Sequence, residues 1–421
     1  MATIQQSHED VVLSRLQAIY PDIEALYTDL HEHPELSMQE VETAKKVTAR
    51  LQAAGLDVTS GVGGTGVVGV LRNGTGPTVM LRGDMDALPL EEKTGLPYAS
   101  HVHMKNRQGE TVPVMHACGH DVHTSCLVGT ATLLAQSRQQ WSGTLLIVAQ
   151  PGEETMEGAR AMLQDGLFTR FPKPDVALGQ HTYAFPAGTL HYRSGNIMAA
   201  EHNLLIRLHG KGGHGALPQR AIDPVVMAAA IVTRLQTIVA REITPGEMAV
   251  LTVGAIHGGT RYNIIPDQAE LQVTLRAQKD DVMQQLVEGV RRIVNAEASA
   301  SRAPKDPEMT TVESTAATYN DATLTQQVVA ALQRSFGADK VMETSPVSGS
   351  EDFSCYGHSA GGAGIPSCFW FVGVTDPQLY QENKGHVPSV HSPRYAPVRE
   401  TALKVGIQAL TVAALSQLAA P

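Results

Sequence analysis

The sequence has little of what marks disulfide-rich, membrane-spanning or nucleic-acid-binding proteins. It contains four cysteines in 421 residues, and their small number and uneven spacing argue against a framework of disulfides. Its longest apolar runs, such as residues 225–232, are far shorter than the ~20 residues that cross a bilayer. Lysine and arginine number 32 against 42 aspartates and glutamates, and the net charge of −10 argues against nucleic acid or an anionic membrane as a partner.

The N-terminus carries charges where a secretion signal would have its apolar core. We therefore expect a cytoplasmic protein, in which a cysteine serves as a metal ligand or catalytic group rather than in a disulfide. Internal repeats and low-complexity tracts are also absent from the sequence. What is plentiful is histidine, with 17 residues, and histidine is the commonest metal ligand in proteins.

The length predicts about two domains, and the order of the expected elements separates them. In the first and last parts of the chain helices and strands alternate, which predicts an α/β domain with a mostly parallel central sheet. A capping box, Ser37-Met-Gln-Glu40, is expected to open a helix that runs to about Leu51. The other expected elements are strands at 66–71, 78–82, 144–149 and 175–179, and helices at 123–136, 156–164, 321–335 and 398–418.

Residues 200–310 follow the order strand, helix, strand, strand, helix, strand, which is the ferredoxin-like pattern. We predict that this segment is a small lid domain inserted into the catalytic domain, which then comprises residues 1–199 and 311–421. The strands of the lid are expected at 202–208, 248–256, 268–275 and 309–312, and its helices at 223–239 and 280–298.

One short segment, MHACGHDVHTSC at residues 115–126, holds three histidines, two cysteines and an aspartate. Ligands of open α/β sheets bind beyond the carboxyl ends of the strands, so ionisable residues at such ends are expected to converge on one edge. Residues of this kind follow the predicted strands or precede the final helix, and they are Asp84, Asp86, Glu153, Glu154, His181 and His391.

Each of these groups also has a purely structural explanation. The two aspartates fit a turn or a helix cap, and the adjacent glutamates fit the solvated start of a helix. An isolated histidine fits a hydrogen-bonded structural role, and Cys118 alone fits a small buried apolar residue. Convergence of all of them on one edge of one sheet favours a metal centre.

The chain also resembles a known family. The phrases GDMDALP, HACGHDVH, QPGEE, GQH, GKGGHGA, RYNIIPD, SEDFS and VHSP occur in the order found in di-metal amidohydrolases, which include aminoacylases, hippurate hydrolases and auxin-conjugate (indole-acetyl-amino acid) hydrolases. These enzymes are related to zinc carboxypeptidases and dipeptidases and have a catalytic domain with a smaller lid. The resemblance extends from His31 to Pro393 and is specific for the family rather than for the substrate.

The resemblance implies roles for residues of the catalytic domain. Glu153 is implied as the general base for the attacking water, and Asp86 as a support that orients the metal ligands. The implied ligands of two adjacent divalent ions, which the Cys118 thiolate is able to bridge, are Cys118, His120, Glu154, His181 and His391.

Three further polar residues near these positions are not expected to bind metal. Asp84 stands where the related peptidases have a ligand histidine, and the resemblance implies that it is no ligand in this branch. His116 and His123 are expected in supporting or structural roles.

The resemblance also assigns residues of the lid. His214 is implied as the donor that stabilises the oxyanion, and Asn263 and Arg276 as the residues that recognise the carboxylate of the amino-acid portion. Closure of the lid would bring these three residues over the metals and exclude water. The sequence leaves open whether His214 acts in its own chain or on a partner subunit, and Arg276 also fits a surface residue at a strand end.

The sequence therefore predicts a metal-dependent amidohydrolase that cleaves small N-acyl amino acids, of N-acetyl or N-aroyl type, to a carboxylic acid and a free amino acid. The alternatives are a dipeptidase or carboxypeptidase with the same centre, and a non-catalytic metal or thiol sensor. Thiolate and imidazole favour zinc, while the carboxylate also admits manganese, cobalt or nickel. The lid is the expected surface for a homodimer or a larger homo-oligomer.

Overall fold

The computed structural model describes residues 2–420, which form two compact units. The larger unit contains the chain up to Ile197, residues Tyr319–Ser345 and the chain from Asp352 onward. The smaller unit contains residues Met198–Thr318 and Pro346–Glu351. It extends past residue 310, where the sequence predicts its end, because the strand Glu308–Thr315 pairs with other strands of this unit.

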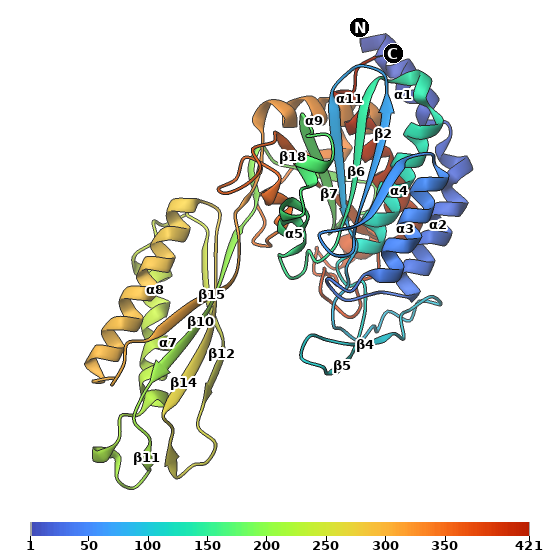
Figure 1. The fold of residues 1–421 in the computed structure, drawn as a ribbon. Helices are drawn as coiled ribbons and strands as arrows, with labels where there is room; N and C mark the ends of the chain where they lie inside the picture. The colour runs from blue at the N-terminus through green and yellow to red at the C-terminus, as the bar shows by residue number, and fades with distance from the viewer. Residues whose placement is uncertain (1, 421) are drawn as a thin grey trace. The chain divides into compact units, whose positions relative to one another are not determined.

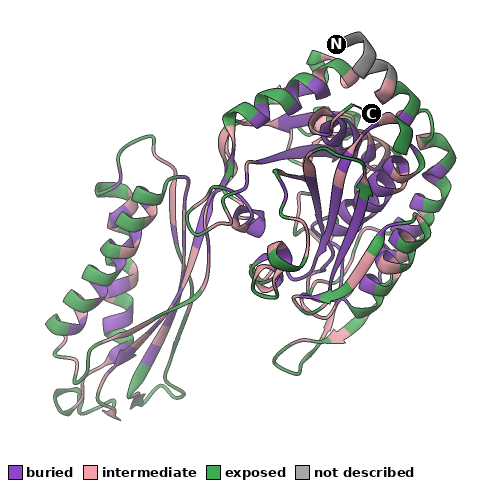
Figure 2. Ribbon diagram, turned by 45° about the horizontal axis from the view of Figure 1, so that its top comes forward, coloured by how far each residue is buried: buried purple, intermediate pink, exposed green. Residues whose placement is uncertain are grey.

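The larger unit is built on an eight-stranded sheet. Its four central strands β6, β3, β7 and β18 run parallel, while the first two strands pair antiparallel. The expected α/β fold with a large, mostly parallel sheet is thus confirmed. Figure 2 shows the central strands buried, as the apolar runs of a sheet covered on both faces require. The order is β1 (Asp57–Val62), β2 (Gly66–Asn73), β6 (Gly143–Gln150), β3 (Thr78–Asp84), β7 (Val176–Pro186), β18 (Ser367–Thr375), β8 (Leu190–Tyr192) and β17 (Val341–Glu343).

Helices pack tightly on this sheet, and α2, α3 and α4 lie side by side (Figure 1). The close approach of α4 and α11 depends on Gly406, since a Cβ there would lie 2.5 Å from the Cys126 sulfur. Cys126 is fully buried at this contact and serves in helix packing. The helices are α1 (Ala2–Leu13), α2 (Leu16–Glu32), α3 (Val41–Ala53), α4 (His120–Gln136), α5 (Gly158–Gln164), α6 (Leu167–Arg170), α9 (Ala322–Phe336), α10 (Pro377–Glu382) and α11 (Arg399–Gln417).

Two expectations for this unit are corrected by the structure. The helix expected to open at Ser37 begins at Val41, and neither Ser37 nor Glu40 caps it, because both side chains bond elsewhere. The strand expected to end at residue 179 continues to Pro186, so His181 lies inside β7 rather than beyond it. Elements that the sequence did not predict include α1, α2, β1 and β18, the hairpin β4 (His103–Lys105) and β5 (Thr111–Pro113), and β9 (Gly195–Met198) with β16 (Thr318–Asn320).

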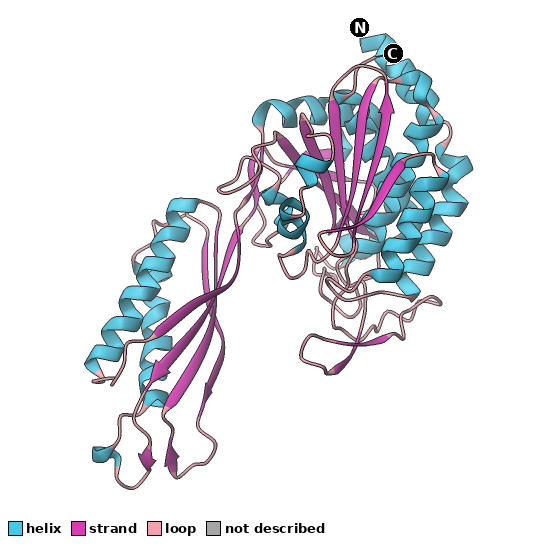
Figure 3. Ribbon diagram, in the orientation of Figure 1, coloured by secondary structure: helices cyan, strands magenta, loops and turns pink. Residues whose placement is uncertain are grey.

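The smaller unit has the expected β-α-β-β-α-β order, and its four main strands are all antiparallel. Figure 3 shows the two long helices of this unit packed on one face of its sheet. Along β14 the side chains alternate, so that Leu271, Val273 and Leu275 belong to the core formed with α7 and α8. The elements are β10 (Ala200–His209), β11 (Gly213–His214), α7 (Pro224–Arg241), β12 (Ala249–Gly258), β13 (Ile264–Ile265), β14 (Gln268–Ala277), α8 (Asp280–Ala300) and β15 (Glu308–Thr315), in the sheet order β12-β14-β10-β15.

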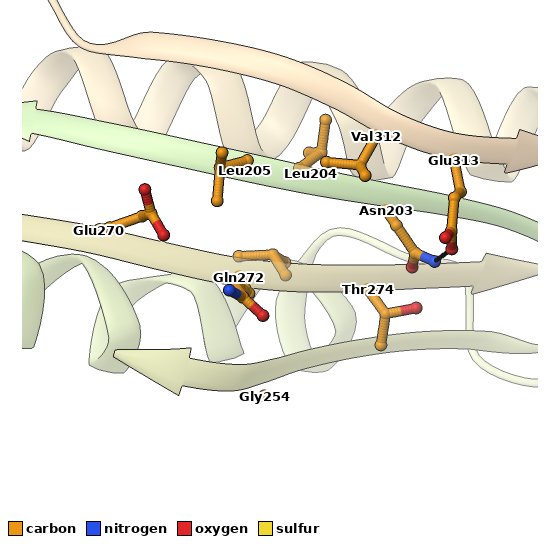
Figure 4. A pocket seen from close by; sticks show the side chains of 10 residues that line it. Asn203, Leu204, Leu205, Gly254, Glu270, Gln272, Thr274, Val312 and Glu313 are labelled. Atoms are coloured by element: carbon orange, nitrogen blue, oxygen red, sulfur yellow. Dashed lines mark hydrogen bonds between the residues drawn. The ribbon is translucent and has the colours of Figure 1, made fainter. Parts of the chain in front are cut away.

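A shallow hollow lies over the strands of this smaller sheet (Figure 4). Glu270, Gln272 and Thr274 of β14 line it, and Asn203 donates a hydrogen bond of 2.9 Å to Glu313 across two neighbouring strands. Aliphatic side chains, among them Leu205 and Val312, line the hollow together with these acidic, amide and hydroxyl groups, so its character is mixed.

By length and composition, α7 is the one helix of the described residues that could cross a membrane. Core helices of folded domains pass the same test. Here Met227, Ile231 and Leu235 of α7 are buried in the core of the smaller unit.

Candidate metal centre

The turn before α4 places two candidate ligands at the edge of the sheet in the larger unit. Cys118 lies in this turn and His120 is the first residue of α4. Gly119 between them has a φ of 80°, and a Cβ at this position would collide with the Thr182 hydroxyl. Only glycine therefore allows the chain to turn here and present both side chains in the same direction.

The other candidates come from three separate elements. Glu153 and Glu154 lie in the turn between β6 and α5, and His181 lies inside β7. His391 lies in the loop before α11 with a φ of 65°, which is unusual for a residue other than glycine. Its backbone N–H donates to the Ala117 carbonyl at 2.7 Å, so this loop is tied to the turn that carries Cys118.

The five predicted ligands form two groups that share the thiol of Cys118. Cys118, His120 and His181 make one group, and Cys118, Glu154 and His391 make the other. Within each group the possible ligand atoms lie within 4.8 Å of one another. The Cys118 sulfur is 3.4 Å from His181 Nε2, and His391 Nε2 is 3.3 Å from Glu154 Oε2. A shared sulfur between two sets of donors is the arrangement that a pair of adjacent ions requires.

The hydrogen bonds of two histidines direct Nε2 toward this cluster. His181 Nδ1 lies 2.5 Å from the Thr182 carbonyl oxygen, which only accepts, so Nδ1 carries the proton and Nε2 has a lone pair. His120 Nδ1 lies 3.1 Å from Asp86 Oδ1 and donates to that carboxylate. Both imidazoles are thus oriented as metal ligands usually are, by a partner on the other ring nitrogen.

Two buried atoms in the cluster remain unsatisfied by the protein. His120 Nε2 and Glu154 Oε1 lie 3.9 Å apart, and neither has a hydrogen-bond partner among the described residues. An unsatisfied buried polar atom costs about 1–3 kcal/mol, and cations bound at the two Cys118 groups would satisfy one of these atoms each. Burial opposes a positive charge on His120, yet Asp84, Asp86 and Glu154 raise its pKa to about 10. The donors present therefore fit divalent ions.

Asp86 is hydrogen-bonded to residues of both groups of predicted ligands. Its Oδ1 accepts from His120, and its Oδ2 accepts from the backbone N–H of Glu154 at 3.0 Å and from the Ser37 hydroxyl at 2.7 Å. Burial acts against the charge of Asp86, but these hydrogen bonds, led by that of His120, hold its pKa below the usual value. The carboxylate thus stays ionised and connects a residue of each Cys118 group.

The thiol of Cys118 needs a positive partner to ionise. Burial, together with the charges of Glu154 and Glu153, raises the pKa of Cys118 well above its usual value. A bound cation reverses this balance, because a coordinating thiol loses its proton. The same residue is inert as a buried thiol and a strong ligand as a thiolate.

Asp84 and His123 lie close to His120, and the three residues form a further group of possible ligands. Asp84 Oδ1 is 2.5 Å from His123 Nδ1, and its Oδ2 accepts from the guanidinium of Arg82 at 2.6 Å. His123 Nε2 accepts from the Thr182 backbone N–H at 2.7 Å, so its Nδ1 is the protonated nitrogen. Both residues are thus engaged in hydrogen bonds, and their expected role as supports of the sheet edge rather than metal ligands stays a prediction.

His116 is buried, and neither of its ring nitrogens has a hydrogen-bond partner among residues 2–420. Burial lowers its pKa to about 4, so the ring is neutral near pH 7. It does not belong to any of the groups of candidate ligands.

Sequence reasoning missed a buried network below the cluster. Arg82, 1 % exposed, donates to Asp84, to Gln150 at 2.9 Å and to Asp352 at 3.0 Å. Gln150 in turn donates to Asp352 at 2.7 Å. The available signal was an arginine inside an otherwise apolar strand, MLRGD, since a charge in such a strand requires buried partners.

The smaller unit carries the three other predicted residues at two separate places. His214 on β11 pairs with Ile264, and the backbone N–H of Gly215 donates to the Asn263 carbonyl at 2.9 Å, so His214 and Asn263 are neighbours. Arg276 lies near the far end of β14, eight residues beyond Gln268, which corresponds to about 26 Å along a strand.

Arg276 is also bound within the smaller unit. Its guanidinium donates to Glu201 Oε1 at 3.0 Å, to Ser350 Oγ at 3.1 Å and to the Ser348 carbonyl at 3.0 Å. These contacts orient the side chain of Arg276. A substrate carboxylate would have to share its guanidinium with Glu201.

An α/β domain that gathers thiol, imidazole and carboxylate donors beside a second adjacent glutamate is that of a metal-dependent hydrolase. The family model of Peptidase family M20/M25/M40 matches residues 80–416. The chain therefore belongs to this peptidase family, as the resemblance of its motifs implied, and it is an amide hydrolase.

Individual relatives agree with this assignment. The chain is 37 % identical over 383 residues to Thermostable carboxypeptidase 1 of Saccharolobus solfataricus, covering 90 % of each chain. It is 39 % identical over 282 residues to the hippurate hydrolase of Campylobacter jejuni, covering 66 % of this chain and 70 % of the relative. A solved dinuclear metal-binding peptidase of the M20 family from Bacillus subtilis is 30 % identical, with a TM-score of 0.75 over 95 % of this chain and 98 % of that chain.

Proposed function

We propose that the enzyme hydrolyses the amide bond of N-acyl amino acids and releases a carboxylic acid and a free amino acid. The observation that carries this proposal is the division between two adjacent glutamates. Glu154 belongs to the group with Cys118 and His391, whereas Glu153 lies in other groups of possible ligands, one of them with His120 and Glu154, and in neither group that shares Cys118. A site that only binds metal has no use for this second carboxylate, while hydrolysis requires a base.

Two bound divalent ions would supply polarisation of the amide carbonyl and a lowered pKa of water. Glu153 is 4 % exposed and its Oε2 lies 3.8 Å from His120 Nε2, so its carboxylate is positioned at the cluster. In the proposed reaction Glu153 accepts the proton of the attacking water and returns it to the departing amine. The ions would be held by Cys118, His120, Glu154, His181 and His391, and Asp86 keeps His120 oriented.

We propose zinc as the native ion, because thiolate and imidazole donors suit it, with manganese, cobalt and nickel as alternatives. Elemental analysis of the protein as purified, followed by reconstitution of the chelated protein with each ion, identifies the metal. An ion that restores activity but is absent from the purified protein would contradict its assignment as the native one.

The smaller unit is proposed as a lid that completes the site. The separation of about 26 Å along β14 is far longer than one N-acyl amino acid, so His214 with Asn263 and Arg276 of one chain do not meet one substrate together. We therefore propose that Arg276 and the pair His214 and Asn263 serve the sites of two different subunits of a homo-oligomer.

Exposed apolar side chains support such an assembly. Val225, Tyr262 and Ile264 line a hollow beside His214 and are at least 38 % exposed, with Tyr262 fully exposed. A cluster of apolar side chains at the surface marks an interaction site, and a second copy of the chain would cover it.

The substrate class is tested by measuring free amine from N-acetyl, N-benzoyl and dipeptide substrates, with and without a chelator. We expect chelator-sensitive release from the N-acyl amino acids. A dipeptidase or carboxypeptidase would release amine faster from the peptides, and a sensor would release none from any substrate.

The contribution of a second subunit is tested by mixing two inactive variants, Glu153→Gln and His214→Ala, under conditions in which subunits exchange. If His214 acts on a partner's site, mixed dimers contain one intact site and recover up to about half of the activity per dimer. No recovery, with exchange verified by mass, would place His214 in the site of its own chain.

A further inference from the structure

We propose that the turn Ser37–Glu40 is a positioning element of the metal centre, in which Ser37 fixes Asp86 and Glu40 fixes the turn that carries Glu153 and Glu154. The inference rests on the proposed function, since the turn acts on the site assigned there. Neither Ser37 nor Glu40 belongs to a group of candidate ligands. Their effect is exerted through hydrogen bonds to residues that neighbour the ligands.

Ser37 bonds to Asp86, whose carboxylate accepts hydrogen bonds from one residue of each Cys118 group. Its hydroxyl donates to Asp86 Oδ2 at 2.7 Å, and the same oxygen accepts from the Glu154 backbone N–H. The other oxygen of Asp86 holds His120. Because Ser37 and Asp86 are both buried, water does not replace this hydroxyl readily, and its bond fixes the plane of the carboxylate.

Glu40 is bonded directly to the turn of the two glutamates. Its Oε1 accepts from the Gly152 backbone N–H at 2.8 Å and from the Met38 backbone N–H at 2.8 Å, and its Oε2 accepts from the Thr65 hydroxyl. Glu40 is completely buried, and no ion pair involves it among the described residues. A buried carboxylate that has no cation is costly, so its retention at this place needs a reason beyond packing.

The two turns are also shaped to fit each other. Gly152 has a φ of 57°, and a Cβ there would lie 2.5 Å from the sulfur of Met38. Met38 itself has a φ of 62°, a conformation that is strained for a residue with a side chain. The Glu40 carboxylate stabilises this conformation through the Met38 N–H, and strain of this kind is typical of functional sites.

Helix capping does not account for these residues, although their S-x-x-E pattern predicts it. The helix α3 begins at Val41, and no side chain caps it from Glu40. The amides of its first turn are instead satisfied by Glu35, which accepts from Glu42 N at 3.1 Å and from Thr43 N at 2.8 Å. Ser37 and Glu40 are thereby left to bond the site.

The test compares Glu40→Ala and Glu40→Gln with the matched control Glu35→Gln, which weakens the helix start in the same segment. Zinc affinity by chelator competition and kcat and KM with an N-acyl amino acid are measured for each. Loss of an outer support typically costs about 10-fold to 100-fold in metal affinity or activity, so we expect that loss in Glu40→Ala, in kcat rather than KM. Glu35→Gln should keep both quantities and lower only the melting temperature.

Glu40→Gln should rescue most of the loss, because its amide oxygen accepts the same two N–H groups and its NH2 donates to the Thr65 hydroxyl. Burial and the nearby charge of Asp86 raise the pKa of Glu40 to about 7. A raised pKa means that protonated Glu40 contributes stability below pH 4.5, which is lost as the pH rises through about 7. Glu40→Gln should lack this pH dependence.

The proposal is overturned if Glu40→Ala binds zinc and turns over substrate as Glu35→Gln does, or if Glu40→Gln is as defective as Glu40→Ala. Should Glu40→Ala not fold, Ser37→Ala and Thr65→Val, which each remove one hydrogen bond, give the same comparison of zinc affinity. A wild-type protein that binds zinc but hydrolyses none of the substrates would refute the proposed function, while the zinc affinities would still decide the role of the turn.

Discussion

His120 Nε2 and Glu154 Oε1 face each other across 3.9 Å, both buried and both without a hydrogen-bond partner among the described residues. They come from different elements, the first residue of α4 and the turn after β6. Asp86 bonds to both residues, through the His120 ring and through the Glu154 backbone. The protein thus holds two possible ligand atoms, one from each Cys118 group, close together in a buried place.

Cys118→Ala should lower metal content and activity together, because Cys118 belongs to both groups of ligands. Cys126→Ala is the matched control, since Cys126 is also buried but packs against α11. Metal analysis and amine release on both variants check this prediction. Full metal content in Cys118→Ala would remove the thiol from the ligand set.

Glu153→Gln and Glu154→Gln should impair different properties of the enzyme, the first its turnover and the second its metal binding. Glutamine at 153 keeps the shape but does not take up a proton, so kcat should fall by about 10²-fold or more while metal is retained. Glutamine at 154 should instead weaken metal binding, because the charged oxygens near His391 and His120 are lost. Equal loss of metal in the two variants would contradict the division of labour between these glutamates.

His31 should make the stability of the larger unit depend on alkaline pH. Its Nδ1 lies 2.6 Å from Asp121 and its Nε2 lies 3.1 Å from Glu92. Burial acts against the charge, but these two hydrogen bonds raise the pKa of His31 to about 10. The stabilisation is therefore complete below pH 6.5 and is lost as the pH rises through about 10.

We expect His31→Gln to lower the free energy of unfolding by about 2 kcal/mol near pH 6 and by less near pH 10. Denaturant unfolding at pH 6, 8 and 10 measures this difference, with the exposed His33→Gln as control. A deficit that stays constant over this range would show that the charge of His31 makes no contribution.

Arg276→Ala should raise KM for substrates with a free carboxylate and change little for the matching carboxamides, because the lost contact is to a charge. His214→Ala should lower kcat for both, since an oxyanion donor acts in the transition state. A two-by-two comparison of these variants and substrates separates the roles. If Arg276→Ala impairs both substrates equally, its role is to hold Glu201 and the Ser348–Ser350 segment in place.

Most of the regular elements were predictable because their patterns are local. Alternating and continuous apolar runs predict β14 and β6, and periodic apolar positions with an Asp start predict α7 and α9. The strand β18 was missed although it lies beside β7 at the centre of the sheet. Its run, SCFWFVGVT, is apolar on both faces, and such a run has no period to distinguish it.

The pattern Ser37-x-x-Glu40 is a case in which the prediction of a helix cap from local sequence is wrong. A capping box and a buried support of a distant turn need the same residue types, and the choice depends on what lies nearby in the fold. Here Asp86 and Gly152, 49 and 112 positions away, compete successfully for these side chains.

The sequence by itself determined the kinds of donor present, the order of the elements and the family, because these depend on residue identity and local spacing. It also predicted one set of metal ligands, namely Cys118, His120, Glu154, His181 and His391. Only the tertiary structure decided that Cys118 is shared by two groups, that Asp84 bonds to Arg82 and His123, and that Arg276 lies far along β14 from His214. The reason is that ligand geometry and hydrogen bonding arise between segments far apart in the chain. For such segments the number of intervening residues does not indicate how close they lie in space.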